Sequence, residues 1–158
     1  MPLTKLWLTN PEQLEKKSIK QIIAFAGSGK LHDQSEASSE FRDYLSHIPS
    51  DYLNRYAAEC LKEKFDESGF ALQDVVNEIG KRIGFDVENG RYRGVVNQIG
   101  FDGLWQSKDG FSLLVEVKTT DVYRIPLNSI AEYRKQLINE KKLSEGNSAI
   151  LIVVGRSE

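Results

Sequence analysis

Glu116 and Lys118 are the residues of this sequence whose types and spacing point most directly to chemistry. They lie two positions apart in the segment 111–118, whose other side chains are mostly apolar. Alternate side chains of a β-strand share a face, so we expect the acid and the base to lie side by side while the intervening residues point into a core. Charges on such a strand carry a large desolvation cost. The two charges can satisfy each other, but the presence of a charged pair here still requires an explanation.

Asp102 is the acid that we expect to lie beside this pair. A turn sequence, 108–110, separates its segment, 101–106, from the segment 111–118. If both segments are strands of one hairpin, the carboxylates of Asp102 and Glu116 come close together and repel each other. A hard divalent cation such as Mg²⁺ removes that repulsion, because it binds one or two carboxylates together with water and phosphate oxygens.

Two further groups complete the predicted site. The backbone carbonyl of Val117 would add an oxygen ligand to the metal. Lys118 would lie where a phosphate and an attacking water meet, and there it would orient the water, help to deprotonate it or stabilise charge on the phosphate. The alternative is that Glu116 and Lys118 form a surface cross-strand pair and that Asp102 is an ordinary turn residue.

This pattern resembles the PD-(D/E)xK nuclease superfamily, whose fold is described as restriction-endonuclease-like. The matching residues are Asp102, Glu116 and Lys118, with Glu-Val-Lys as the (D/E)xK element; the usual proline before the aspartate is replaced by Phe101. The resemblance covers roughly residues 71–154. It implies an endonuclease that hydrolyses DNA phosphodiester bonds with Mg²⁺, for which Mn²⁺ can substitute, and that leaves a 5′-phosphate. Restriction or defence against foreign DNA is the setting that it suggests.

The resemblance also implies supporting residues. Glu78, on the first helix of the core, would be an additional metal ligand, although a solvated helix charge is an equally open interpretation. Four cations near predicted strand ends are candidates for contacting DNA phosphates, as are two residues of the next helix, where some branches of the family place a polar residue in the site. These candidates are Arg91, Arg93, Lys108 and Arg124, with Arg134 and Gln136 on the helix. Solvated surface is the alternative for each of them.

Periodicity predicts the elements that must position these residues. Before Gly69 every strong pattern is helical, with helices predicted at 11–26, at 35–46 and from a Ser50 cap to about residue 65. After it, a helix ending at Gly84 is followed by strands, a helix and a last strand. The strands are predicted at 85–88, 101–106, 111–118 and 148–154, with 91–96 as a possible second arm after the Asn89-Gly90 turn signal, and the helix at 127–143.

The predicted class is therefore α/β, with a mixed central sheet flanked by helices. Residues 1–70 would form a helical N-terminal region packed on a nuclease core at 71–158. The run 148–154 is apolar throughout, which is typical of a strand buried on both faces. Because the sequence stops soon after it, we expect the N-terminal part of a larger protein. A homodimer is a further expectation, because cutting both DNA strands takes two sites.

Composition limits the function without choosing it. The 158 residues are 40% hydrophobic and 28% charged and include a single cysteine, which excludes an internal disulfide. The start shows no signal peptide, and no apolar run reaches the ~20 residues that span a bilayer, so a cytoplasmic protein without a membrane partner is expected. The net charge of −2 permits DNA binding without arguing for it. The competing hypothesis is a non-catalytic module on the same fold that binds nucleic acid or protein.

Overall fold

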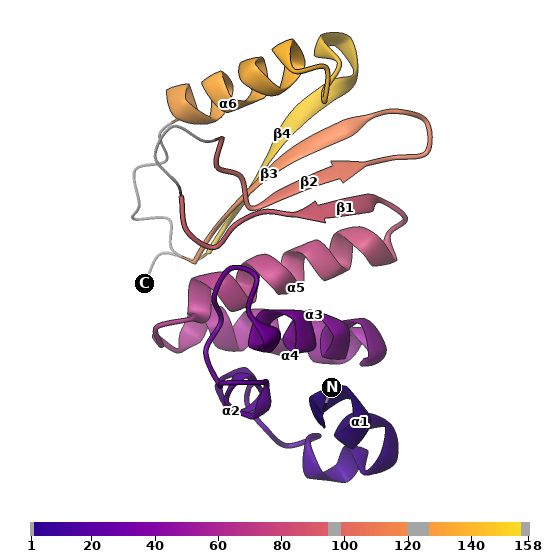
Figure 1. Ribbon diagram of the computed structural model, residues 1–158, viewed down its shortest axis with the longest axis vertical. Helices are drawn as coiled ribbons and strands as arrows, with labels where there is room; N and C mark the ends of the chain where they lie inside the picture. Colours follow the sequence, from indigo (N-terminus) through magenta and orange to yellow (C-terminus); the bar gives the residue numbers. More distant parts are fainter. Residues whose placement is uncertain (1, 95–98, 120–126, 156–158) are drawn as a thin grey trace. The chain divides into compact units, whose positions relative to one another are not determined.

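The computed structural model describes residues 2–94, 99–119 and 127–155. This part of the chain contains six α-helices and one mixed sheet of four strands, which confirms the α/β class (Figure 1). The chain divides into two compact units, Met1–Glu78 and Ile79–Glu158. The division falls inside a helix, and each unit is described by itself.

The first unit is helical. It contains α1 (Pro2–Thr9), α2 (Ile19–Phe25), α3 (Glu36–His47), α4 (Ser50–Lys62) and most of α5 (Ser68–Arg82). Its core includes two fully buried tyrosines, Tyr44 of α3 and Tyr56 of α4, whose hydroxyl groups form a hydrogen bond of 2.8 Å. Pairing these hydroxyls satisfies polar groups that would otherwise be costly to bury.

The helix predicted at 11–26 is wrong. The structure has α1 before it, a single 3₁₀ turn at Pro11–Gln13, and α2 beginning only at Ile19. The reason is a second start signal: the Ser18 side chain accepts the Gln21 backbone N–H while the Gln21 side chain accepts the Ser18 N–H. This reciprocal capping begins a new helix within the predicted one.

The other helix predictions of the first unit need smaller corrections. The helix predicted at 35–46 is confirmed as α3, with Ser35 as its N-cap. Ser50 is the first residue of α4 and not its cap, which is Pro49, and α4 ends at Lys62. The buried Cys60 lies in this helix, and its burial raises the pKa of the thiol to about 12.

The second unit is built on the sheet. Its elements are the end of α5 (79–82), β1 (Asp86–Asn89), β2 (Gly103–Gln106), β3 (Ser112–Lys118), α6 (Leu127–Asn139), a 3₁₀ turn at Glu145–Asn147, and β4 (Ser148–Val154). The strand order is β1-β2-β3-β4; the first two pairs are antiparallel and β3 pairs with β4 in parallel. The predicted order of a helix, three strands, a helix and a strand is confirmed.

The second arm predicted at 91–96 is not a strand in its described residues, 91–94, because β1 pairs with β2 instead. Gly90 serves a different purpose from the predicted hairpin turn. Its N–H donates to the Asp102 carbonyl at 3.0 Å, and a Cβ at this position would lie 1.7 Å from the carbonyl oxygen of Phe101. Glycine is therefore required because two backbone segments pass very close to each other.

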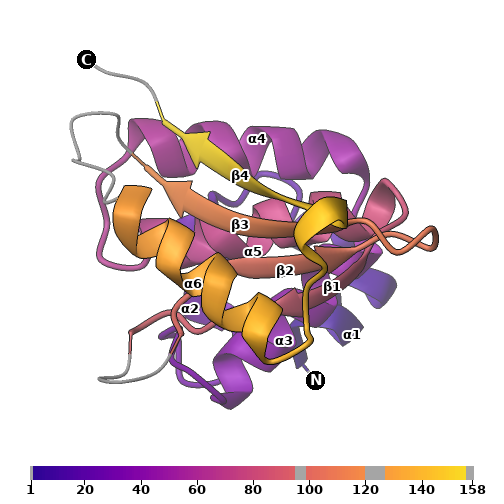
Figure 2. The ribbon, with the colours of Figure 1, turned by 90° about the horizontal axis from the view of Figure 1, so that it is seen from above.

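Each face of the sheet packs against helical residues of the same unit. Helix α6 lies across one face (Figure 2), where Leu104 and Leu114 of the strands pack in one cluster with Ile130 and Leu137 of the helix. On the other face, Trp105 contacts the end of α5: a Cβ on Gly80 would lie 2.6 Å from its indole ring.

Strand β4 is less buried than its apolar sequence suggests. It is a terminal strand of the sheet, its first six residues are half-buried, and Val154 is 41% exposed. The prediction of a strand buried on both faces is therefore wrong, because among the described residues only β3 pairs with it. No helix in the described part of the chain is long and apolar enough to cross a membrane.

Candidate active site

The β2–β3 hairpin brings Asp102 to Glu116. Gly103 pairs with Val115, so Asp102, the residue before β2, lies level with Glu116 on the neighbouring strand. The Asp102 N–H donates to the Val115 carbonyl at 3.0 Å. Its carboxylate oxygen Oδ2 accepts the backbone N–H of Val117 at 2.6 Å. The side chain is thus fixed across the hairpin, close to the end of β3.

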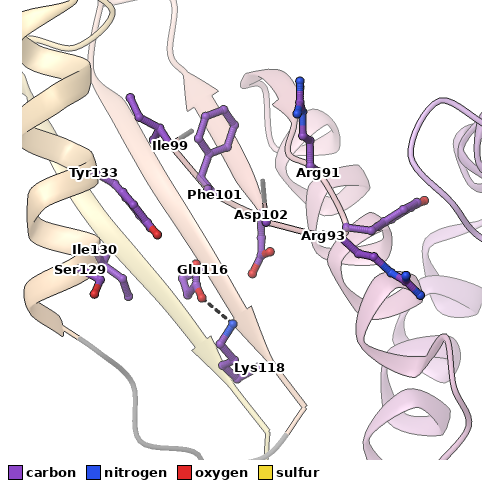
Figure 3. A pocket seen from close by; sticks show the side chains of 13 residues that line it. Arg91, Arg93, Ile99, Phe101, Asp102, Glu116, Lys118, Ser129, Ile130 and Tyr133 are labelled. Carbon is purple, nitrogen blue, oxygen red and sulfur yellow. Dashed lines mark ion pairs between the residues drawn. The ribbon is translucent and has the colours of Figure 1, made fainter. Parts of the chain in front are cut away.

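Glu116 and Lys118 form the ion pair that their spacing suggested. The Nζ of Lys118 lies 2.5 Å from Oε1 of Glu116, and the two side chains are 25% and 16% exposed. Figure 3 shows this pair beside the Asp102 carboxylate, with all three groups directed into one pocket. The strand therefore presents an acid and a base at the end of the face that α6 covers, while Val115 and Val117 are buried.

We call the pocket around these groups the carboxylate pocket. It has a volume of about 300 Å³. The sheet contributes Asp102, Glu116 and Lys118, and α6 contributes Ser129, Ile130 and Tyr133. The long connection between β1 and β2 provides the remaining wall through residues 91–94 and 99–101. A pocket of this size admits a phosphate group with water.

The two acids influence each other electrostatically. Burial first, and then the nearby carboxylate of Glu116, raise the pKa of Asp102, which lies at about 6 instead of 3.8. The Val117 N–H and the charge of Lys118 act in the opposite direction, because both favour the ionised form. A cation bound beside Asp102 would therefore stabilise the ionised form of its carboxylate.

The donor set fits a hard divalent cation of the Mg²⁺ type. Mg²⁺ is usually held by one or two carboxylates, and water and substrate oxygens complete its shell. Asp102 and Glu116 supply such a pair, and the effect of Glu116 on the ionisation of Asp102 is what a shared cation would relieve. Across the ranges 2–94, 99–119 and 127–155, no three His, Cys, Asp or Glu side chains gather into a group that could hold a metal ion. The fit therefore rests on the two carboxylates.

The remaining predicted ligands are Val117 and Glu78. The amide of Val117 takes part in the site by binding Asp102, while the role of its carbonyl as a ligand stays a prediction. Glu78 is 5% exposed and is the last residue of the first unit. Its role as a third ligand also stays a prediction.

The predicted DNA-contacting cations fall into different places. Arg91 and Arg93 are exposed and line the carboxylate pocket. Lys108 lies in the turn between β2 and β3, at the end of the hairpin opposite to Asp102. Arg124 lies outside the described residues. Of these predicted cations, Arg91 and Arg93 are the ones that the described residues place in the same pocket as Asp102, Glu116 and Lys118.

Helix α6 presents other residues to the site than those predicted. The Arg134 guanidinium donates to the carbonyls of Glu145 and Ser148 and to the Ser148 hydroxyl, at 2.7, 3.1 and 2.9 Å, so it ties α6 to the start of β4. Gln136 lines a neighbouring hollow. Ser129, Ile130 and Tyr133 are the helix residues that line the carboxylate pocket, and none of them was predicted.

A sequence signal for Tyr133 did exist. Ile130 and Leu137 are seven positions apart, which corresponds to two helical turns, and both are buried against the sheet. Tyr133 lies between them on the same side and packs against the same cluster. Ser129 lies one turn before Tyr133.

Comparison of the chain with protein-family models, with curated proteins and with solved structures gave no match.

Proposed function

We propose that this protein is an Mg²⁺-dependent endonuclease that hydrolyses phosphodiester bonds of DNA. The observation that carries the proposal is the convergence of Asp102, Glu116 and Lys118 in one pocket, with the Asp102 carboxylate bound to the Val117 N–H at 2.6 Å and Lys118 paired with Glu116 at 2.5 Å. Two acids and a base in one pocket, all held by the β2–β3 hairpin and the residue before it, form a set that suits metal-dependent phosphodiester hydrolysis.

Asp102 and Glu116 would hold the metal. A bound Mg²⁺ would supply Lewis-acid chemistry toward the phosphate and the attacking water. The chain contributes rigidity: both carboxylates are on a hairpin, and Asp102 is fixed by two hydrogen bonds to β3, one from its own N–H and one to its carboxylate. This pre-organisation keeps the ligands in place before substrate arrives.

Lys118 would act on the phosphate and the attacking water. In the pocket, Lys118 forms an ion pair with Glu116 and is therefore an ammonium group. An ammonium group donates hydrogen bonds, so it orients the water and stabilises the charge that builds on the phosphate. The water oxygen bonds to phosphorus, the bond from phosphorus to the 3′ oxygen breaks, and the proton released by the water is balanced by the proton that the 3′ oxygen gains. The products carry a 5′-phosphate and a 3′-hydroxyl.

The fold is proposed to be restriction-endonuclease-like. The order of a helix, three strands, a helix and a strand, with a parallel β3–β4 pair and the acids at the end of the β2–β3 hairpin, supports this assignment. DNA is the proposed partner, and Arg91 and Arg93, which line the pocket, would contact its phosphates. A homodimer, and a role in restriction or defence, are further parts of the proposal.

The test is cleavage of labelled DNA by the full chain and by Lys118→Ala. We expect Mg²⁺-dependent cleavage by the unchanged protein and a loss of about 10²–10³-fold in the variant, the range found when one charge-stabilising donor is removed. The circular dichroism spectrum should stay the same. Cleavage at the original rate by the variant would overturn the proposal. Metal binding without cleavage by either protein would favour the non-catalytic module instead.

A further inference from the structure

A second hollow lies beside the carboxylate pocket. It has a volume of about 620 Å³ and is formed by the end of β1, the C-terminal half of α6 and the connection between β1 and β2. We call it the amide pocket, after Asn89 and Gln136, which line it. Both pockets share Arg91, Ile99 and Phe101, so they are adjacent and have a common wall. In Figure 3 the side chains of Ile99 and Phe101 lie on the opposite side of Asp102 and Glu116 from Lys118.

The two pockets differ in charge. The carboxylate pocket has three cations, Arg91, Arg93 and Lys118, and its two acids are those proposed to bind metal. The amide pocket is lined by two cations, Arg91 and Lys142, and by two acids, so that its charges cancel. The acids are Glu88 and Glu140. Lys142 is moreover paired with Glu140 at 3.0 Å. A phosphate is therefore favoured in the first pocket, and a neutral ligand is favoured in the second.

The other residues that line the amide pocket indicate the chemical class of its neutral ligand. Asn89 and Gln136 each offer an amide with donors and an acceptor, which suits a planar group that carries both at its edge. Phe101 and Ile99 offer half-buried apolar surface on which such a group can stack. A nucleobase has this combination of an apolar face and a polar edge.

We propose that the amide pocket binds one unpaired nucleobase of the DNA strand whose phosphate lies in the carboxylate pocket. This inference rests on the proposed function and adds the substrate class: single-stranded DNA, or DNA that is locally unpaired at the site. A base whose edge is bound by side-chain amides cannot pair with a complementary strand at the same time. Arg91, which belongs to both pockets, would contact the phosphate that links the bound base to the strand.

The test measures binding by fluorescence anisotropy, with Ca²⁺ in place of Mg²⁺. Labelled single-stranded oligonucleotides carry one abasic position, moved along the strand from one oligonucleotide to the next. We expect one position at which loss of the base weakens binding about tenfold, as loss of base stacking does elsewhere. The double variant Asn89→Ala with Gln136→Ala should bind intact and abasic strands equally. Asn139→Ala, an exposed amide on α6 outside both pockets, is the matched control and should keep the difference.

Three outcomes overturn the inference: no abasic position matters, the double variant keeps the difference, or duplex DNA binds more tightly than the single strand. Thermal unfolding of each variant, followed by circular dichroism, excludes loss of fold as the cause. The proposed hydrolysis fails separately, through unchanged cleavage by Lys118→Ala. Cleavage without a base effect therefore rejects the nucleobase site alone, and a base effect without cleavage rejects the nuclease alone.

Discussion

The backbone N–H of Val117 donates to the carboxylate of Asp102 at 2.6 Å, across the β2–β3 hairpin. This bond occupies one side of the Asp102 carboxylate and turns the other toward Glu116 and the pocket (Figure 3). It therefore joins the strand that carries Glu116 and Lys118 to the residue that precedes the neighbouring strand. The position of Asp102, the first proposed metal ligand, therefore depends on the backbone N–H of the residue after Glu116, the second.

Asp102→Asn should stabilise the protein without metal at about pH 7. The folded pKa of Asp102 is raised from 3.8 to about 6, so the stability that this carboxyl contributes is present below pH 3.8 and is lost as the pH rises to about 6. Asparagine can still accept the Val117 N–H but carries no charge. Urea unfolding in EDTA should show the variant more stable by on the order of 1–2 kcal/mol at about pH 7, with the difference absent at about pH 4. A variant that is less stable at about pH 7 would contradict the raised pKa.

Glu116→Gln should weaken binding of divalent metal. The amide removes one of the two charges that face the cation and leaves the side chain the same size. Calorimetric titration with Mn²⁺ should give a dissociation constant at least about tenfold higher, which corresponds to about 1.4 kcal/mol. Glu132→Gln, on the exposed side of α6, provides the control. Equal affinities of the two variants would exclude Glu116 as a ligand.

Gly90→Ala should disturb the site from a distance along the chain. A Cβ at this position would lie 1.7 Å from the Phe101 carbonyl oxygen, so the backbone before Asp102 must move. Overpacking of this kind costs about 1–3 kcal/mol, measurable by urea unfolding, and Mn²⁺ affinity should fall as well. At Gly146 a Cβ meets nothing within 4 Å, so Gly146→Ala should change neither quantity. Unaltered stability of Gly90→Ala would show that this close approach does not exist.

Arg91→Ala and Lys108→Ala should differ in DNA binding. Arg91 lines both pockets, while Lys108 lies in the turn at the other end of the hairpin. Loss of one phosphate contact lowers the slope of log affinity against log salt by about 1, so Arg91→Ala should show this change and Lys108→Ala should not. Anisotropy titrations over a range of salt concentrations measure both slopes. Identical slopes for the two variants would remove Arg91 from the proposed phosphate path.

The sequence was sufficient for the hairpin but not for its surroundings. Alternation in 111–118 and the turn at 108–110 are local patterns, and they correctly predict that Asp102 and Glu116 come together. The pairing of β1 with β2 joins segments separated by the long connection 90–102, which no local pattern specifies. Asn89-Gly90 is a strong turn signal. The glycine is nevertheless required by its close approach to Phe101, and a short stretch of sequence around residue 90 does not contain Phe101.

The helices illustrate the same limit. Asn10-Pro11 as a start signal and Gly27 as an end signal predicted one helix over 11–26, and the capping box of Ser18 and Gln21 between them was missed. On α6, Arg134 and Gln136 were predicted to enter the site because they are polar. Packing against the sheet decides instead which residues of the helix line the pocket. Arg134 is engaged with Glu145 and Ser148, and Tyr133 takes the position facing the pocket.

The separation between the hairpin and the parallel pair has a kinetic consequence. Asp102, Glu116 and Lys118 are all within 102–118, a segment that closes on itself through β2 and β3, whereas β4 joins β3 only after the chain has passed through α6. Contacts between residues close in sequence lose less loop entropy and form sooner. We therefore expect the Val117 amide to become protected from hydrogen exchange earlier during refolding than the amides of β4, so that the acids are assembled before the sheet is complete.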